Sequence, residues 1–157
     1  MGSNPTLSAM TDEEAIRLAI QEAKLALEHE DVPIGALVIL DNEVIASRHN
    51  ERQLTGDPTA HAEVLALREA AEKLGTWHLE GATLVSTLEP CPMCAGAAIN
   101  SRITRVIFGA HDPKAGAAET LYNLFADPRL NHQAEVTSGI LAVECGELLS
   151  NFFSARR

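Results

Sequence analysis

Two short stretches about thirty residues apart constrain this chain more than any other feature. The first is His-Ala-Glu at residues 61–63, and the second is Pro-Cys-Pro-Met-Cys at residues 90–94. The Cys-x-x-Cys spacing of Cys91 and Cys94 suits chelation of one metal ion, and His61 offers a third ligand. Three protein ligands leave one corner of a zinc tetrahedron for water, which is the arrangement of a catalytic zinc site. A structural zinc site normally has four protein ligands.

Glu63 follows the candidate ligand His61 by two positions. Zinc lowers the pKa of a bound water from ~15.7 to about 7, so a neighbouring carboxylate can take its proton near neutral pH. We therefore predict that Glu63 is the catalytic acid/base, a role that typically contributes roughly 10²–10⁴ in rate. The order His-x-Glu and then Pro-Cys-x-x-Cys is typical of zinc-dependent nucleobase deaminases. Each half alone is a weak signal, whereas both halves in this order, each opening a helix, are specific.

Three other interpretations of these residues stay open at this point. Cys91 and Cys94 are compatible with a redox pair, although the flanking prolines and the upstream His-x-Glu disfavour it. His61 is compatible with a helix-capping or core histidine. Cys145 is conceivable as the fourth ligand of a closed structural zinc site, but its apolar surroundings favour a buried, inert thiol.

Size and composition indicate one ordinary globular domain. The 157 residues are enough to bury a single core, and three cysteines do not make a disulfide framework. No apolar run is long enough to cross a bilayer, and no N-terminal stretch resembles a secretory signal. We therefore expect a cytoplasmic protein with no membrane partner. Residues 1–10 are predicted to be a flexible tail, and residues 11–157 a single zinc deaminase domain.

The net charge of −10 taken alone argues against a nucleic-acid partner, because phosphate binding needs a basic surface. The charge is uneven, however. Residues 1–31 hold seven acidic and two basic residues, which is half of the total net charge. Eight basic residues elsewhere are candidates for a local basic face: Arg48, Arg52, Arg102, Arg105, Lys114, Arg129, Arg156 and Arg157.

Hydrophobic periodicity and turn signals predict a layered α/β fold. A capping box at Thr11 and Glu14 opens a helix that runs to about residue 30. Strands are expected at 34–40, 44–48, 83–88, 105–109 and 134–137, with a turn at 41–42 and a loop at 112–118. Helices are expected at about 60–73, 92–100 and 141–155. This order predicts a three-layer α/β/α architecture, with a central mixed sheet of about five strands and helices on both faces.

From residue 12 onwards, the chain resembles the bacterial tRNA-specific adenosine deaminases of the cytidine deaminase superfamily. The resemblance rests on Val-Pro-Ile-Gly-Ala at 32–36, Asp-Pro-Thr-Ala-His-Ala-Glu at 57–63, Thr-Leu-Glu-Pro-Cys at 87–91 and Met-Cys-Ala-Gly-Ala at 93–97. It also includes Phe-Gly-Ala at 108–110, Lys-x-Gly-Ala at 114–117, Asn-His at 131–132 and Phe-Phe at 152–153. The zinc motifs occur in many deaminases. The stretches after residue 105 are therefore what distinguishes the tRNA-specific adenosine deaminases from the other members of the superfamily.

The resemblance implies a cytidine-deaminase-like fold and a homodimer with one zinc per subunit. It also implies conversion of the wobble adenosine of an arginine tRNA anticodon to inosine. Carried over by position, His61, Cys91 and Cys94 become the zinc ligands and Glu63 the proton shuttle. Asn50 becomes a base-contacting residue, although a turn residue after a strand is the plainer interpretation.

The resemblance also implies contacts to the anticodon arm of the tRNA. Asp112 becomes a residue near the RNA backbone, where it can accept from a 2′-OH, although an ordinary turn aspartate fits the sequence nearly as well. Lys114, Arg156 and Arg157 become candidates for phosphate contact. Phe153, with its neighbour Phe152, becomes an aromatic wall for a splayed base, and at least one of the two is expected in the core.

Departures from the family pattern concern the substrate more than the chemistry. Arg52 and Gln53 follow Asn50 where the pattern leads us to expect a proline, and His111 stands where we expect an arginine. The main alternative function is a guanine or cytosine deaminase acting on free bases. Such enzymes share the zinc motifs but do not need residues 114–117 or 131–132. A non-catalytic, zinc-stabilised interaction module is a third possibility, and Glu63 argues against it.

Overall fold

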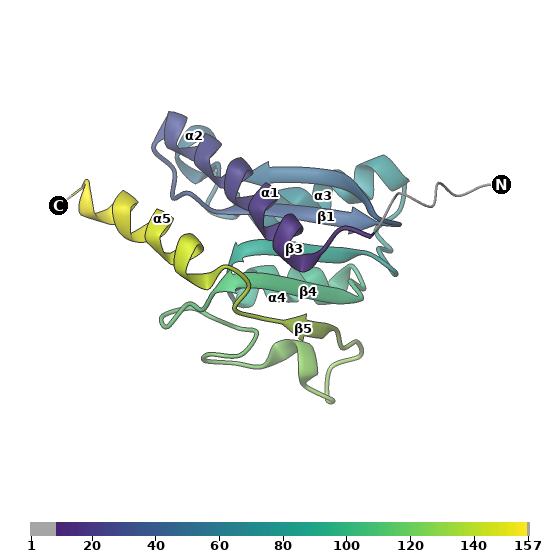
Figure 1. Cartoon of the computed structure of the whole chain (residues 1–157). Helices are drawn as coiled ribbons and strands as arrows, with labels where there is room; N and C mark the ends of the chain where they lie inside the picture. The colour runs from purple at the N-terminus through teal and green to yellow at the C-terminus, as the bar shows by residue number, and fades with distance from the viewer. Residues whose placement is uncertain (1–8, 157) are drawn as a thin grey trace.

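The computed structural model describes residues 9–156, and Figure 1 shows the arrangement of its elements. Residues 1–8 of the predicted tail, and Arg157, lie outside the described residues. The elements are α1 (Asp12–Leu25), η1 (Ala26–His29), β1 (Gly35–Leu40), β2 (Glu43–His49), α2 (Arg52–Thr55), α3 (Ala62–Leu74), β3 (Thr83–Leu88), α4 (Pro92–Asn100), β4 (Arg105–Ala110), η2 (Leu124–Ala126), β5 (Glu135–Thr137) and α5 (Ala142–Ser154).

The five strands form one mixed sheet in the order β2-β1-β3-β4-β5. β1 pairs antiparallel with both β2 and β3, whereas β3, β4 and β5 run parallel. Asp41 and Asn42 join β1 to β2 with φ values of 51° and 63°, as a two-residue hairpin turn of type I′ requires. The predicted sheet of about five strands is confirmed. Its parallel half brings the ends of β3 and β4 to the same edge.

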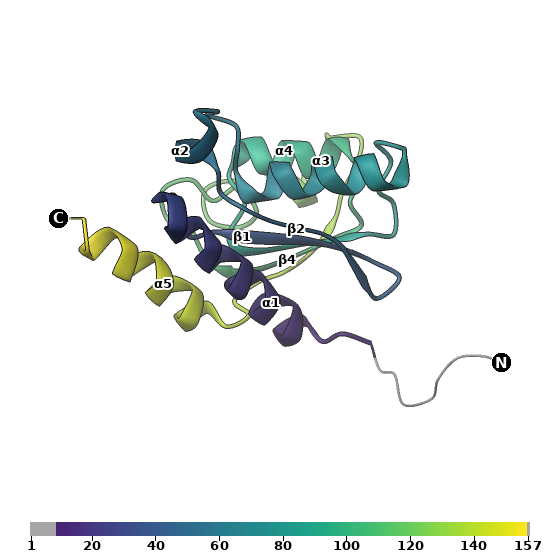
Figure 2. The same ribbon diagram turned by 90° about the horizontal axis from the view of Figure 1, so that it is seen from above.

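Helices cover both faces of this sheet. Figure 2 shows α3 and α4 on one side, and α1 and α5 on the other. Alternate residues of β1 point to opposite faces, so Ala36 and Val38 join the core beneath α3 and α4 while Leu37 joins the core beneath α1. The predicted three-layer α/β/α architecture is therefore confirmed.

Gly35 allows α1 to lie very close to the start of β1. A Cβ atom at this position would lie 2.1 Å from the carbonyl oxygen of Ala19 and 2.7 Å from the backbone nitrogen of Ala23. Both obstacles are helix backbone, which cannot rotate away. A residue without a side chain is therefore needed where the chain leaves α1 and enters the sheet.

The first helix and the segment after β2 differ from the prediction. The α-helix that Thr11 caps ends at Leu25, and a 3₁₀ turn carries the chain to Glu30, whose φ of 59° stops it. The short helix α2 follows β2 where only a strand end was expected. Asp31 stabilises α2 by accepting hydrogen bonds from the backbone N–H groups of Gln53 and Leu54. This contact across 22 and 23 residues has no local sequence signal.

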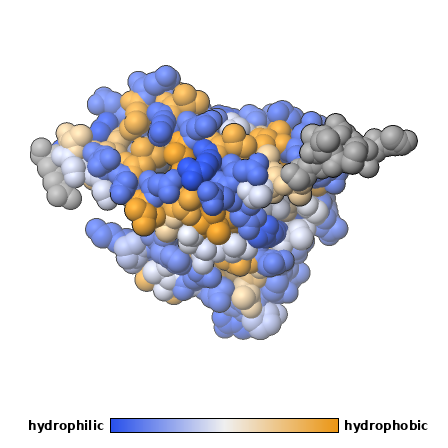
Figure 3. Space-filling view, in the orientation of Figure 1, coloured by the Kyte–Doolittle hydropathy of each residue, from blue (hydrophilic) through white to orange (hydrophobic). Residues whose placement is uncertain are grey.

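The surface has both polar and apolar regions. In Figure 3, hydrophobic residues gather near the middle of the face that α1 and α5 cover. Leu18 and Leu25 of α1 and Val143 of α5 are among the exposed apolar side chains. Within residues 9–156, none of the helices is both long enough and apolar enough to span a bilayer.

Candidate active site

Two helix N-termini bring the predicted metal ligands together. His61 is the N-cap of α3, with extended backbone at φ −74° and ψ 147°, and Cys91 is the N-cap of α4. Cys94 lies in the first turn of α4, which begins with Pro92. The Nδ1 atom of His61 lies 3.6 Å from the sulfur of Cys91 and 3.4 Å from that of Cys94. The three ligand atoms all lie within 4.8 Å of one another.

This arrangement fits a single zinc ion. Nitrogen and sulfur ligands at their usual bond lengths and tetrahedral angles lie about 3.6 Å apart, close to both separations in the structure. Two sulfurs and one imidazole are also the donor set that suits zinc chemically. Within residues 9–156, no other group of three His, Cys, Asp or Glu side chains meets the same distance criterion. Cys145 is therefore not a fourth member of the cluster, which leaves the closed structural site without support.

Cys91 and Cys94 shift each other's thiol pKa in opposite directions. A hydrogen bond from the Cys94 thiol lowers the pKa of Cys91 to about 4, with burial opposing the shift. The same bond raises the pKa of Cys94, as do its burial and the nearby Glu63 carboxylate. Hydrogen bonding to Cys91 also raises the pKa of His61. A cation that replaces the thiol proton of Cys94 would leave both sulfurs as thiolates, which is the form that binds metal.

Glu63 enters the same space from the first turn of α3. Its side chain is buried, at 4% exposure, and interacts electrostatically with His61 and through a hydrogen bond with Cys94. Burial raises the pKa of its carboxyl to about 7. The geometry reflects the start of the helix. His61 is still extended while Glu63 is already helical, so residues two apart can face one point.

Asn50 connects β2 to the start of α3. It is buried, and its Oδ1 accepts a hydrogen bond of 2.8 Å from the backbone N–H of Ala62, the residue after His61. The side chain therefore holds the helix end that carries His61 and Glu63. Asn50 also lines a cavity of about 290 Å³ together with Arg52, Phe152 and Arg156.

Glu89 is a site residue that the sequence interpretation missed. It is 1% exposed and directly precedes the Pro-Cys-x-x-Cys segment. Its carboxylate accepts hydrogen bonds from the backbone N–H groups of Asp112, Ala118, Glu119 and Thr120, and from the hydroxyl of Thr120. Burial alone would raise the pKa of Glu89, but these hydrogen bonds outweigh it and lower the pKa. An acidic residue at the end of an apolar strand was the available signal.

The loop that Glu89 organises carries two predicted RNA-contacting residues. Asp112 Oδ1 accepts from the backbone N–H groups of Lys114 and Ala115, so the aspartate forms the turn itself. Lys114 lines a groove of about 870 Å³, together with Asp112, Phe153 and Arg156. Phe153 is 49% exposed, whereas Phe152 is buried beneath the guanidinium of Arg156, 3.6 Å from its ring centre. The expectation that one of the two phenylalanines belongs to the core is confirmed.

The other predicted basic residues have acidic or aromatic partners. Arg48 pairs with Glu51, Arg105 pairs with Asp12, and Arg129 pairs with Asp127. Arg102 lies over the ring of Trp77. Arg52, Lys114 and Arg156 are the basic residues that line the two cavities near Asn50 and the Glu89 loop.

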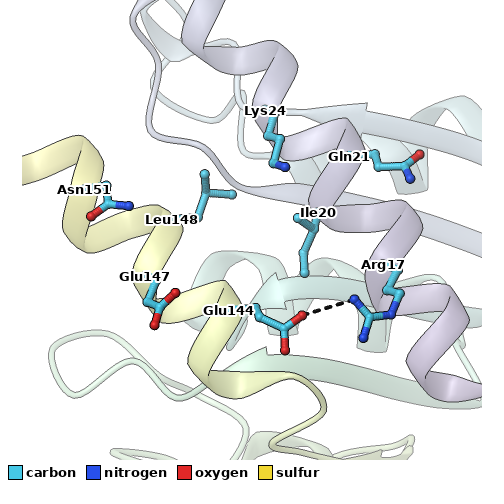
Figure 4. A pocket seen from close by; sticks show the side chains of 8 residues that line it. All are labelled: Arg17, Ile20, Gln21, Lys24, Glu144, Glu147, Leu148 and Asn151. Atoms are coloured by element: carbon cyan, nitrogen blue, oxygen red, sulfur yellow. Dashed lines mark hydrogen bonds and ion pairs between the residues drawn. The ribbon is translucent and has the colours of Figure 1, made fainter.

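A separate groove of about 390 Å³ lies between α1 and α5 (Figure 4). Arg17 spans it with a hydrogen bond of 3.2 Å to Glu144. Its lining contains none of the predicted site residues. The Arg17–Glu144 contact at this groove links α1 to α5.

Comparison with known proteins agrees with this geometry. The family model for MafB19-like deaminases matches residues 10–157. The chain is 55% identical over 146 residues to the tRNA-specific adenosine deaminase of Bacillus subtilis, covering 93% of this chain and 91% of that protein.

Two solved structures have similar folds. One comes from studies of A-to-I editing by tRNA:A34 deaminases at the wobble position, with a TM-score of 0.83 and 45% identity, covering 86% of this chain and 98% of that one. The guanine deaminase of Nitrosomonas europaea has a TM-score of 0.81 over 96% of this chain and 88% of its own, but at 24% identity it shares the fold alone. On this sequence similarity, the chain belongs to the family of tRNA-specific adenosine deaminases.

Proposed function

We propose that this protein converts the wobble adenosine of a tRNA anticodon, specifically that of an arginine tRNA, to inosine and ammonia. Residues 11–157 would act as one catalytic domain in the cytoplasm, as a homodimer with one zinc per subunit. The convergence of Glu63 on the cluster of His61, Cys91 and Cys94 is the observation that supports the chemistry most strongly. The 55% identity to the Bacillus subtilis enzyme supports the substrate.

In the proposed mechanism, the Nδ1 atom of His61 and the sulfurs of Cys91 and Cys94 hold the zinc. When bound there, zinc makes water a nucleophile at neutral pH by lowering its pKa. Glu63 takes a proton from the attacking water and donates a proton to N1 of adenine as the oxygen adds to C6. It then moves the remaining hydroxyl proton to the 6-amino group. Ammonia leaves, and the C6 carbonyl of inosine remains.

The substrate contacts follow from the residues around the two cavities. The Oδ1 atom of Asn50 is engaged by Ala62, so its side-chain N–H₂ is the group that would donate to a purine nitrogen. Phe153 offers an exposed ring for stacking, and Lys114 and Arg156 offer charges for phosphates. Asp112 would accept from a 2′-OH. Flipping an unpaired anticodon base into such a site costs little.

The test is direct. The zinc-loaded protein is incubated with an anticodon stem-loop of an arginine tRNA carrying adenosine at the wobble position, and inosine is measured there. Free guanine, cytosine and adenosine are assayed in parallel for ammonia release. Inosine in the RNA, with no turnover of the free compounds, is the expected result. Turnover of guanine or cytosine without inosine formation would favour the base deaminase instead.

Removal of the Glu63 carboxylate tests the assigned proton transfers. Glu63→Gln should keep one zinc per chain and lower kcat by roughly 10²–10⁴, because general acid/base catalysis is lost. Glu72→Gln, at an exposed position on the same helix, is the matched control and should match wild type. Wild-type turnover by the Glu63 variant, measured at full zinc content, would contradict the assignment.

A further inference from the structure

A second histidine cluster lies apart from the proposed zinc ligands. It combines Glu22 of α1, His29 of η1, Asp31 and His49, the last residue of β2. The Nδ1 atom of His29 lies 2.5 Å from Asp31 Oδ2, and the Nδ1 atom of His49 lies 2.5 Å from Glu22 Oε2. The two Nε2 atoms face each other at 3.1 Å. The ring centroids are 5.2 Å apart, with 30° between the ring planes.

If both rings are neutral and both carboxylates ionised, no hydrogen lies between the Nε2 atoms of His29 and His49. An ionised carboxylate only accepts hydrogen bonds, so each Nδ1 atom must carry the hydrogen that it donates. A neutral imidazole has one N–H group, and each Nε2 atom therefore presents a lone pair. Two lone pairs at 3.1 Å repel each other unless a positive species lies between or beside them. A bound cation that takes both lone pairs would remove this repulsion.

The net negative charge of the cluster also favours a bound cation. With neutral rings, Glu22 and Asp31 bring a formal charge of −2 to a half-buried location. Across residues 9–156, no Lys or Arg nitrogen lies within 4.0 Å of either carboxylate, and their ion-pair partners are the two histidines. Both carboxylates are also held in place by other donors. Ser47 donates to Glu22, and two backbone N–H groups donate to Asp31.

We propose that His29 and His49 form a second metal site, for a divalent cation that prefers imidazole, such as Ni²⁺, Cu²⁺ or Zn²⁺. Two nitrogens at about 2.0–2.1 Å from one ion, at angles of about 90–109°, lie about 2.8–3.4 Å apart. This range includes the 3.1 Å between the two Nε2 atoms. A carboxylate behind each ligating imidazole is the usual support of such a site. Side-chain exposures of 16% and 17% for the two histidines leave room for water to complete the coordination.

A cation at this site would join three parts of the chain. It would link η1 to the end of β2, and α1 through Glu22. Asp31 accepts hydrogen bonds from backbone N–H groups in the first turn of α2. His49 directly precedes Asn50 in the chain. The site shares no residue with the cluster of His61, Cys91 and Cys94, so its occupancy does not depend on the proposed deaminase activity.

Metal counting tests the proposal. The zinc-loaded protein is dialysed to equilibrium against Ni²⁺. The number of zinc and nickel ions per chain is then measured by elemental mass spectrometry. Wild type should hold one Zn and one Ni, whereas His29→Asn and His49→Asn should keep the zinc and lose the nickel. His78→Asn is the matched control, because His78 lies near a carboxylate, 3.8 Å from Glu80, and its ring neighbour is Trp77, not a second imidazole. This variant should bind nickel as wild type does.

Two further measurements keep the result interpretable if a histidine variant unfolds. Glu22→Gln leaves both rings in place and should weaken nickel binding about 10–100-fold, because a supporting carboxylate is lost. Paramagnetic Ni²⁺ should also broaden the NMR signals of His29 and His49 before those of His78. Absence of the extra nickel in wild type would overturn the proposal. So would nickel retained in both histidine variants, or a single shared Nε2–H resonance that nickel leaves unchanged.

Discussion

Glu63 and Glu89 are the same residue type, and their surroundings give them opposite properties. Both side chains are almost fully buried. Burial dominates at Glu63 and raises its pKa to about 7, which suits a group that takes up and releases protons. Five donors face Glu89 and lower its pKa, so it stays an anion and an acceptor. The hydrogen-bond partners, more than the residue type, decide which glutamate is suited to chemistry.

The thiol of Cys145 gives a pH prediction at the residue scale. Burial raises its pKa to about 11, against about 8.5 in an unfolded chain. The folded state therefore keeps its proton over a range where the unfolded state loses it. The contribution to stability is complete below about pH 8.5 and falls as pH rises to about 11, by up to about 3 kcal/mol.

Urea unfolding of wild type and Cys145→Ala at pH 7 to 11 measures this effect. The difference in unfolding free energy, wild type minus variant, should be constant to about pH 8. Above that pH it should decrease, because wild type loses stability as Cys145 titrates and alanine does not titrate. A difference that stays constant to pH 11 would show that Cys145 ionises normally in the folded protein.

At the scale of elements, helix ends and one loop assemble the site. The N-termini of α3 and α4 present His61 and Cys91, and the loop after β4 wraps around the Glu89 carboxylate. Gly116 makes this wrapping possible, because a Cβ atom there would lie 2.3–2.6 Å from the Glu89 carboxylate group. The loop that carries Asp112 and Lys114 is thus tied to the strand end that delivers the cysteines.

Gly116→Ala should loosen this loop. The added methyl must displace the Glu89 carboxylate from its donors, and we expect a loss of about 1–3 kcal/mol in unfolding free energy. We also expect a higher KM for the stem-loop RNA with zinc content unchanged. Gly96→Ala is the control, because its Cβ meets nothing within 4 Å and lies within α4. That change should be neutral or stabilise by up to ~1 kcal/mol. Equal effects of the two substitutions in urea unfolding would contradict the proposed clash.

For the whole molecule, local charge matters more than the total of −10. Several arginines are engaged by acidic neighbours, and these include Arg156, which lies 4.0 Å from Glu30. Arg52, Lys114 and Arg156 line the cavities beside Asn50 and the Glu89 loop. Glu30, Asp31 and Asp112 line the same cavities, so the proposed phosphate contacts depend on single basic residues and not on a continuous basic surface. The proposed RNA contacts predict a salt dependence that comes from these few residues.

Lys114→Gln tests this at the level of binding. Loss of one phosphate contact should raise KM for the stem-loop RNA, leave kcat unchanged, and reduce the slope of log affinity against log salt by about 0.7. Lys73→Gln is the matched control, because Lys73 is exposed at the end of α3 and lines neither cavity. An unchanged salt slope for Lys114→Gln, measured by fluorescence anisotropy, would remove Lys114 from the proposed interface.

The sequence alone determined the fold class, the strands and the set of candidate metal ligands, because these follow from local periodicity and from donor chemistry at fixed spacing. The capping box, the hairpin turn and Pro92 at the start of α4 are signals of this local kind. Only the tertiary structure decided which groups meet across long stretches of chain. Three such contacts depend on how the sheet and helices pack. Asn50 accepts a hydrogen bond from the N–H of Ala62, Glu89 accepts hydrogen bonds from a loop about thirty residues later, and His29 faces His49. Contacts between distant residues depend on the whole fold, and no local pattern encodes them.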